Sequence, residues 1–368
     1  MYGPSQIMAW LEEKVQGVRR SRLKTLAAIV GGAMVMQGVG VLALGRSMAG
    51  PAKAKHRIKR VDRFLGNRKV ELHAIGSALF HALRPRSGPV VVLADWTDRH
   101  GFVQLALALP FQGRALPFYS VVVEKGDGSG AHEGLMIEAE AQALEALSAM
   151  CGDAITPVII ADRGFGNRRW LEDIQNRGWH FVQRLARNHS VDVEDYLGVL
   201  SELGIRRGYR PKDWGWGVMG EKPGGKMRLV TVYDRDAKEP WHLATNLPKA
   251  CAGEVVNLYK KRMWIEAAFR DLKNRNWGMG MDAVKLSDEG RIEPHFIVLV
   301  LAYLFLTAYG AVAEADGAAR HMKANTVENR VLNLARIGQY FLAILSVPIT
   351  YAINRMLDFP ELIKTGDY

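Results

Sequence analysis

Three acidic residues stand where this sequence could hold divalent cations. Asp95 follows the apolar run PVVVLA, Asp162 follows the apolar run ITPVIIA, and Glu266 lies in a helical pattern farther along the chain. The two aspartates therefore fall at the ends of predicted strands, where ligand sites gather in open sheets. Mg²⁺ prefers oxygen ligands, and two ions about 3.5–4 Å apart stabilise the attacking and leaving oxygens of an in-line phosphoryl displacement. The acids predict metal-dependent phosphoryl transfer.

Each acid also has a plainer interpretation. A strand-terminal aspartate is often a turn or helix-cap residue, and a glutamate in the middle of a helix is usually solvated. The helix predicted over residues 254–273 bears on this choice. Tyr259, Arg262 and Glu266 follow one another at steps of three and four, and Lys273 lies two turns farther on.

Steps of this size place all four side chains on one face of a helix. That face either points to solvent, with Arg262 and Glu266 forming an ordinary i,i+4 ion pair, or it forms a site. In the second case Glu266 binds a metal ion and the other three side chains contact DNA phosphates.

The composition favours a polyanionic partner. The 368 residues include 49 Lys and Arg against 38 Asp and Glu, a formal net charge of +11. Such an excess indicates either a polyanionic partner such as nucleic acid or a solvated surface that is merely basic, and charge alone does not decide between them. With 48% hydrophobic and 24% charged residues, the chain is globular rather than disordered, collagen-like or a coiled-coil rod. Cys151 and Cys251 are too few for a disulfide framework or a four-thiolate zinc site.

Hydrophobic periodicity predicts the elements that must position the acids. Three strands follow one another from residue 89, the second and third as a hairpin around Gly113. An amphipathic helix over 132–150, the strand before Asp162, a helix over 168–176 and the strand HFVQRLA come next. This β-β-β-α-β-α-β order predicts a mixed α/β sheet, whose crossover helix brings the two strands that carry aspartates close together.

Two stretches outside this core have a distinct composition. Residues 51–69 are rich in Lys and Arg, interleaved with Phe64 and Leu65, which can anchor a helix to a core. Their charges predict either phosphate contacts or a solvated helix face; the candidates are Arg57, Lys59, Arg60 and Arg63. Residues 190–250 hold Gly, Pro, three tryptophans and strand-like pieces, and they predict a β-rich insertion.

Two apolar runs raise the question of a membrane. Residues 26–44 are uncharged and long enough to span a bilayer. Four glycines and Gln37 interrupt this run, and Gly31-Gly32 falls where a turn between two short helices would lie. We therefore predict a buried helix pair there, in preference to a membrane span. The second run, residues 295–315, is predicted to be a core helix.

These motifs resemble those of a known family. Tyr259-x2-Arg262-x3-Glu266-x6-Lys273 is similar to the Y-(2)-R-(3)-E-(6)-K signature of bacterial insertion-sequence DDE transposases. The segment DRGF at 162–165 resembles the one that carries the second acid of that group, and ADWT at 94–97 resembles the one around its first acid. The basic segment 56–67 and the segment LATNLP also have counterparts. The resemblance covers about residues 20–310, with the motifs in the right order.

The resemblance implies an RNase H-like mixed sheet flanked by helices, interrupted by the β-rich insertion and preceded by a helical DNA-binding region. It implies that Asp95, Asp162 and Glu266 are catalytic and bind two Mg²⁺ ions, for which Mn²⁺ can substitute. Members free a 3′-OH at a transposon end and join it to target DNA by transesterification. The DNA-binding residues it implies are Tyr259, Arg262 and Lys273; Arg163 could also contact phosphate or could pair with a nearby acid.

Relatives in that group pass through a hairpin DNA end with a flipped base stacked on a tryptophan of the insertion. Aromatic stacking contributes about 1–3 kcal/mol per base. The candidates in this chain are Trp214, Trp216 and Trp241, each of which could equally pack in the core.

The predicted division has four parts: an N-terminal helical DNA-binding region over 1–85, an RNase H-like core over 86–189 and 251–315, the insertion over 190–250, and a C-terminal helical segment over 316–368. The expected partner is double-stranded DNA, bound by a homodimer in the cytoplasm at the nucleoid, without a membrane or a small-molecule cofactor. Two alternatives stay open: a DNA-binding regulator derived from a transposase that does not cut, and an RNase H-like nuclease without strand transfer.

Overall fold

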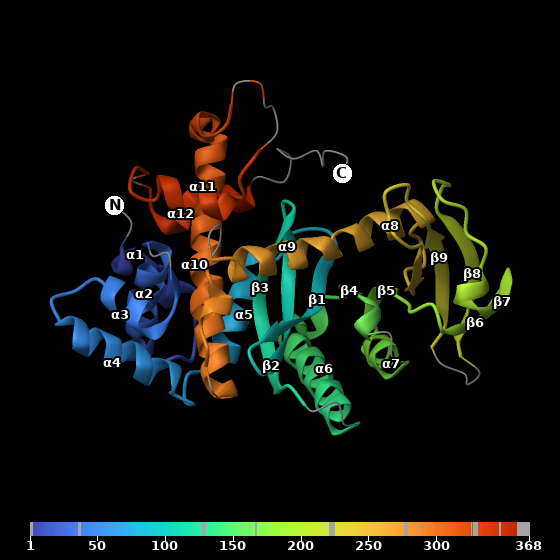
Figure 1. Cartoon of the computed structure of the whole chain (residues 1–368), viewed down its shortest axis with the longest axis horizontal. Helices are drawn as coiled ribbons and strands as arrows, with labels where there is room; N and C mark the ends of the chain where they lie inside the picture. The colour runs from blue at the N-terminus through green and yellow to red at the C-terminus, as the bar shows by residue number, and fades with distance from the viewer. Residues whose placement is uncertain are drawn as a thin grey trace. The chain divides into compact units, whose positions relative to one another are not determined.

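The chain divides into two compact units (Figure 1). The computed structural model describes residues 3–358 apart from 36–37, 127–129, 166–167, 221–224, 276–278, 287, 325, 327–329 and 346. We call the two parts the helical unit, which comprises Met1–Leu83, Asp98–Phe102 and Ala268–Tyr368, and the sheet unit, which comprises Arg84–Thr97 and Val103–Ala267. The three predicted acids all belong to the sheet unit.

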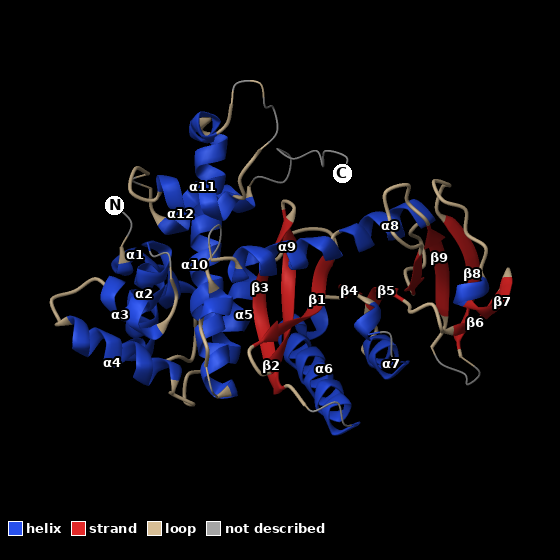
Figure 2. Cartoon of the chain, in the orientation of Figure 1, coloured by secondary structure: helices blue, strands red, loops and turns tan. Residues whose placement is uncertain are grey.

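A mixed sheet of ten described strands forms the sheet unit (Figure 2). Its strand order is β3-β2-β1-β4-β5-β10-β9-β8-β6-β7. Strands β1, β4 and β5 run parallel to one another, whereas the pairs from β5 through β10, β9, β8 and β6 to β7 are antiparallel. The mixed α/β sheet predicted from the sequence is confirmed. The strands are β1 (Val90–Arg99), β2 (Phe102–Phe111), β3 (Arg114–Glu124), β4 (Pro157–Ala161), β5 (His180–Arg184), β6 (Ser190–Val193), β7 (Tyr196–Val199), β8 (Lys212–Met219), β9 (Met227–Val232) and β10 (Trp241–Thr245).

The central strands are apolar because both of their faces are covered. Every residue of β4 is buried, and the first five residues of β1 are buried as well, which is the pattern of strands in the middle of a parallel arrangement. The predicted hairpin between β2 and β3 is present. Its turn places Gln112 and Gly113 at φ 46° and 80°, the positive values that a two-residue hairpin turn requires.

Residues 190–250 are β-rich, as predicted, and their strands extend the core sheet. Strand β10 pairs antiparallel with β5, with Leu243 opposite Arg184 and Thr245 opposite Val182. Strands β9 and β8 then follow outward. The insertion and the core of the sheet unit therefore share one continuous set of backbone hydrogen bonds.

Helices α6 (Gly130–Cys151), α7 (Arg168–Asn176) and α8 (Ala252–Lys260) pack on this sheet. Helix α6 contacts β3, α7 contacts β5, and α8 contacts β4, β5, β9 and β10. The continuous helix predicted over 254–273 is wrong in one detail: it is interrupted at Lys261, and α9 (Arg262–Lys273) begins at the next residue. The backbone of Lys261 keeps φ −64° and ψ −19°, so the interruption only slightly alters the helical path.

The helical unit is built around α10 (Glu289–Ala315), which is buried from Phe296 to Ala313. Helix α10 contacts α2, α4, α5, α11 and α12, and in Figure 1 it is the long orange helix beside the blue N-terminal helices. The predicted core helix over 295–315 is thus confirmed. The other helices of the unit are α1 (Pro4–Lys14), α2 (Arg20–Val35), α3 (Val41–Ser47), α4 (Ala54–Leu65), α5 (Leu72–Leu83), α11 (Leu334–Phe341) and α12 (Ile349–Leu357); residues 359–368 of the predicted C-terminal segment lie outside the described residues.

The prediction of a turn at Gly31-Gly32 is wrong, although the buried helix pair exists. Helix α2 runs through both glycines to Val35, and α3 packs against it. A Cβ on Gly32 would lie 3.3 Å from the Leu44 carbonyl oxygen. The glycines therefore allow two helices to approach closely.

One described helix, α10, has the length and apolar character to cross a membrane. All of its most apolar window is buried inside the protein.

Candidate active site

Asp95 and Asp162 lie on neighbouring parallel strands at the same level of the sheet. In the register of β1 and β4, Ala94 pairs with Ala161, and each aspartate is the next residue. Strand β1 itself continues to Arg99, so Asp95 marks the point where β1 leaves β4 rather than the end of the strand. Strand β4 does end there, because the Phe165 amide donates to the Asp162 carbonyl at 3.0 Å and turns the chain.

The Asp162 carboxylate is held by both helices that follow the insertion. The Tyr259 hydroxyl of α8 donates to Oδ1 at 3.0 Å. Nη1 of Arg262, the first residue of α9, lies 3.1 Å from Oδ2. Both carboxylate oxygens thus have a partner from the segment that the sequence analysis singled out.

Glu266 joins the same group through Arg262. Nη2 of Arg262 donates to Oε1 of Glu266, one turn along α9, so a single guanidinium bridges the second and third predicted acids. The i,i+4 ion pair named in the sequence analysis is present, and Arg262 also faces Asp162 rather than solvent. Burial lowers the pKa of Arg262, but the acids around it outweigh burial, and the pKa lies above its ordinary value.

Asp95 completes the group electrostatically. Its Oδ1 accepts a hydrogen bond from the Trp96 amide at 3.0 Å. Burial, opposed by the Arg262 guanidinium and assisted by the Glu266 and Asp162 carboxylates, raises the pKa of Asp95 to about 7. The first acid is therefore close enough to sense both of the others, and its charge is incompletely balanced in the protein alone.

Tyr259 is a neutral hydrogen-bond donor in this site. It is 2% exposed, and burial, with a further contribution from the Asp162 carboxylate, raises the pKa of its phenol well above the ordinary value. Trp241, the first residue of β10, packs edge-on against the Tyr259 ring with centroids 5.0 Å apart. Of the three predicted stacking candidates, Trp241 is the one placed against a site residue.

Trp214 and Trp216 lie on β8 and contact other residues of the insertion. Nε1 of Trp214 donates to Thr231 Oγ1 at 2.8 Å, and Lys212 Nζ lies 3.4 Å from the centre of its ring. Trp216 faces the guanidinium of Arg228 at 5.9 Å. All three tryptophans are half-buried.

Two residues near the acids were missed in the sequence. Arg184 Nη1 lies 3.9 Å from Asp162 Oδ1, and Arg184 Nη2 lies 2.6 Å from Glu239 Oε1. Arg163 pairs with the same glutamate at 3.1 Å. Of the two predicted roles of Arg163, contact with phosphate or pairing with a nearby acid, the structure shows the second. In the structure Gln183 pairs with Ala161, so Arg184 is level with Asp162, but this register could not be predicted from the sequence. Glu239 lies in the segment between β9 and β10, and no motif or periodicity in the sequence marks it as part of a site.

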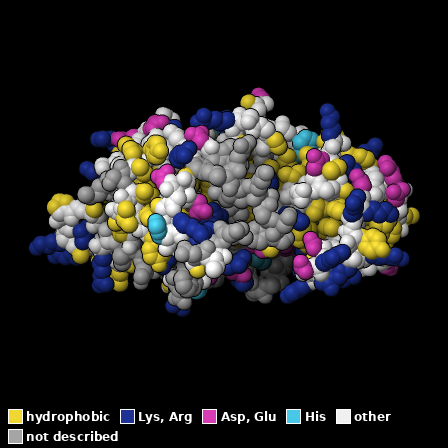
Figure 3. Space-filling view, turned by 90° about the horizontal axis from the view of Figure 1, so that it is seen from above, with side chains coloured by type: hydrophobic (Ala, Val, Ile, Leu, Met, Phe, Trp, Pro, Cys, Tyr) yellow, Lys and Arg dark blue, Asp and Glu magenta, His cyan; other side chains and the backbone are white. Residues whose placement is uncertain are grey.

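The other predicted DNA-binding residues belong to the helical unit. Lys273 is the last residue of α9, and the remaining four lie on α4. Arg57 donates to the carbonyls of Gly50 and Arg46, and Arg60 donates to Thr25 Oγ1, whereas Lys59 and Arg63 are exposed. Figure 3 shows Lys and Arg side chains over the α4 end and over the insertion strands on the face that it draws.

The carboxylates suit a hard divalent cation by their chemistry. As placed, however, no three His, Cys, Asp or Glu side chains among the described residues are grouped closely enough to hold an ion. The Arg262 guanidinium lies between Asp162 and Glu266 and supplies the positive charge that an oxygen-ligated cation would otherwise bring. The donor set fits the metal, provided that Arg262 moves.

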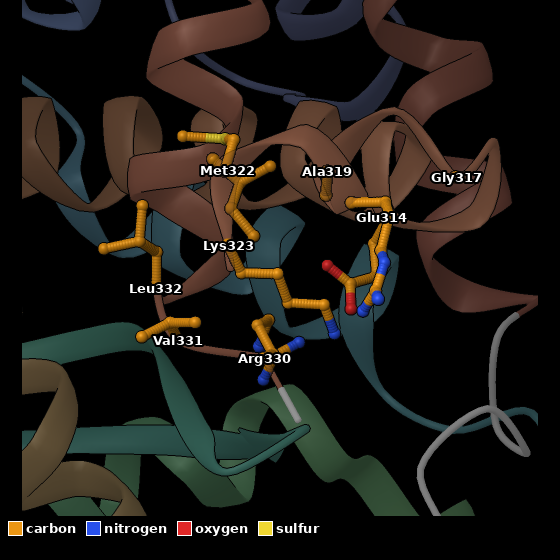
Figure 4. Close-up of a pocket in the computed structure, with 10 residues that line it drawn as sticks. Glu314, Gly317, Ala319, Met322, Lys323, Arg330, Val331 and Leu332 are labelled. Atoms are coloured by element: carbon orange, nitrogen blue, oxygen red, sulfur yellow. The ribbon is translucent and has the colours of Figure 1, made fainter. Parts of the chain in front are cut away.

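A separate pocket lies in the helical unit (Figure 4). Residues from the end of α10, from the 3₁₀ helix η5 (Ala318–Met322) and from the segment before α11 line it, including Glu314, Lys323 and Arg330. The acid group belongs instead to the sheet unit.

A mixed sheet with aspartates level with each other on adjacent parallel strands, and a glutamate brought to them from a later helix, defines an RNase H-like core. A family model described as "Transposase DDE domain" matches residues 86–305. The match covers more than half of the chain, and the chain therefore belongs to the family of DDE transposases, which act on DNA and generally use divalent metals. A search of curated proteins found no match.

Proposed function

We propose that this chain cleaves phosphodiester bonds at the ends of a bacterial insertion sequence and joins the freed 3′-OH to target DNA. One observation carries the proposal: Asp95 and Asp162 follow paired residues of neighbouring strands, and Arg262 connects Asp162 to Glu266. The three acids follow the chain order D, D, E, the second 67 positions after the first and the third 104 positions after the second, and all three belong to one unit.

Asp95, Asp162 and Glu266 would hold two Mg²⁺ ions, with Mn²⁺ able to substitute. When bound, such ions activate the attacking oxygen and neutralise the leaving oxygen. In the first step, an oxygen of water attacks the phosphorus at the transposon end, the bond to the 3′-oxygen breaks, and that oxygen takes a proton. In the second step, the 3′-oxygen loses its proton and attacks the phosphorus of a target phosphodiester. The bond from that phosphorus to the target 3′-oxygen breaks, and the displaced oxygen takes a proton.

The chain's own residues position the acids and the DNA. Tyr259 orients Asp162 through its hydroxyl, and Trp241 packs against the Tyr259 ring, which makes Trp241 the best-placed candidate to stack a flipped base. Arg262, Lys273, Arg163 and the α4 residues would contact phosphates. A homodimer at the nucleoid, holding two transposon ends, completes the proposal.

The test is Mg²⁺-dependent cleavage by Glu266→Gln, with Glu202→Gln as the control. Both changes replace a carboxylate by an amide, and Glu202 is an exposed residue of the same unit. The substrate is DNA that includes the sequences flanking the gene, because transposon ends lie outside the coding region. We expect Glu266→Gln to lose about 10²–10³-fold or more in cleavage rate while DNA binding is kept, and Glu202→Gln to cleave normally.

The products separate the alternatives. Cleaved and joined DNA supports a transposase, and cleavage without joining indicates an RNase H-like nuclease. Specific binding without cleavage by the unmodified chain indicates a regulator. Cleavage by Glu266→Gln at the unmodified rate would remove Glu266 from the site.

A further inference from the structure

Arg262 occupies the place where the second and third acids of the site would share a cation. Its guanidinium is almost completely buried, with 6% of the residue exposed. Nη1 faces Asp162 and Nη2 faces Glu266. Its Nε is buried without a hydrogen-bond partner among the described residues. The two terminal nitrogens of the guanidinium are therefore paired with acids, while its third nitrogen is not paired.

This contact engages the oxygens that a metal ion would need. Oδ2 of Asp162 faces Arg262, Oδ1 accepts from Tyr259, and Oε1 of Glu266 accepts from Arg262. A cation that entered beside the guanidinium would meet a unit positive charge within a few Å, where screening by water is weak. Metal and Arg262 therefore compete for the same carboxylates.

We propose that Arg262 is a latch that keeps the acid group closed to metal until DNA binds. The inference rests on the function proposed above. If the buried guanidinium of Arg262 separates from the two carboxylates, it needs another anion as a partner, because an unpaired buried charge is strongly unfavourable. A DNA phosphodiester is such an anion and accepts the same two-pronged hydrogen bonding from arginine. Transfer of Arg262 from the acids to a phosphate frees the acids for the metal.

The position of Arg262 in the chain suits this exchange. It is the first residue of α9, directly after the interruption at Lys261, and its neighbour Met263 is 45% exposed. The side chain can therefore turn toward solvent without breaking the middle of a helix. The latch makes metal binding and DNA binding mutually favourable, and thermodynamic linkage requires the coupling to be equal in both directions.

The experiment measures Mn²⁺ binding to the metal-free full chain, without DNA, by electron paramagnetic resonance of the free ion. The variants are Arg262→Gln and Lys260→Gln. Lys260 is exposed, lies two residues away and carries the same charge, so its variant controls for the general loss of one positive charge. We expect Arg262→Gln to bind Mn²⁺ about tenfold or more tightly than the unmodified chain, and Lys260→Gln to change the affinity less than about twofold.

Equal affinities for Arg262→Gln and Lys260→Gln would overturn the latch. If Arg262→Gln does not fold, as judged by circular dichroism, Arg262→Lys replaces it. A lysine has a single ammonium in place of the fork, so we expect its Mn²⁺ affinity to exceed that of the unmodified chain; an unchanged affinity would again count against the latch.

Two further variants keep this test distinct from that of the proposed function. Asp162→Asn and Glu266→Gln should each lose Mn²⁺ affinity if these acids are ligands. If both bind Mn²⁺ as well as the unmodified chain does, the metal site itself is misassigned. If both lose affinity and Arg262→Gln gains none, the metal site stands and the latch fails.

Discussion

Replacing Asp95 by Asn should stabilise the metal-free protein while it removes one of the three acids that we propose to be catalytic. Burial, followed by the nearby carboxylates of Glu266 and Asp162, raises the pKa of Asp95 from its ordinary 3.8 to about 7. The folded state thus binds this proton more tightly than the unfolded chain does. Asp95 contributes its full stability below pH 3.8, and this contribution is lost as the pH rises through about 7.

The magnitude follows from the linkage between pKa and folding. One pH unit between the two pKa values corresponds to about 1.4 kcal/mol, so ionisation of Asp95 removes up to about 4 kcal/mol from the free energy of unfolding by pH 8. Asparagine has a similar shape and does not ionise. The advantage of Asp95→Asn over the unmodified chain should therefore grow by about 2 kcal/mol between about pH 5.5 and 7, and level off above that.

The assay is urea unfolding in EDTA, followed by circular dichroism across this pH range. Asp192→Asn is the control, because Asp192 is an exposed strand residue of the same unit, and its change should stay within about 0.5 kcal/mol. If Asp95→Asn is no more stable than the unmodified chain at pH 8, or if its advantage does not vary with pH, the electrostatic description of the site is refuted.

Three more predictions concern the helical unit. A Cβ on Gly310 of α10 would lie 1.8 Å from a carbonyl oxygen of α11, so Gly310→Ala should lower the free energy of unfolding by about 3 kcal/mol. The control is Gly134→Ala, which has open space around it and should be neutral or slightly stabilising. Urea unfolding of the two variants measures the difference. Burial lowers the pKa of His295 to about 3, so His295 contributes stability that is present above about pH 6.5 and lost on acidification. The free energy of unfolding of His295→Asn should therefore depend less on pH below 6.5 than that of the unmodified chain. An equal dependence of the two free energies on pH would contradict this. Neutralising both Lys59 and Arg63 should reduce the slope of log affinity for DNA against log salt by about 2, and an unaltered slope in a filter-binding titration would exclude both from the interface.

The electrostatics of the candidate site depend strongly on one short segment. Residues 259–266 supply a phenol, a guanidinium and a carboxylate within about two turns. The phenol and the guanidinium contact Asp162, and the carboxylate contacts the guanidinium. In the metal-free protein the single charge of Arg262 balances only part of the negative charge of the acids. A small displacement of Arg262 would change that balance, which makes the start of α9 the most informative place for mutation.

The sequence by itself determined the strands and most of the helices around the acids. Runs such as PVVVLA and ITPVIIA are short, apolar and rich in β-branched residues, a pattern that favours a buried strand, and a crossover helix between two such strands favours a parallel arrangement. The order of Asp95, Asp162 and Glu266, and the spacing from Tyr259 to Glu266, were likewise readable because helical and strand periodicities are local properties of the chain.

The tertiary structure decided which alternative each residue adopts. The spacing of Arg262 and Glu266 allowed an exposed ion pair or a site, and only the packing of α8 and α9 brought Arg262 to Asp162. The arginine then bridges two acids. Similarly, Gly31-Gly32 suggested a turn from local propensity, whereas the close approach of α3 made the glycines useful inside a helix.

Long-range strand pairing was the other feature that the sequence could not supply. Strand β10 returns from the insertion to pair with β5, and this carries Trp241 to Tyr259, while Glu239 just before the strand meets Arg184. Backbone hydrogen bonds between distant segments have almost no signature in the side chains of either segment. The acids were therefore predictable from the chain, but their partners depend on how the sheet is closed.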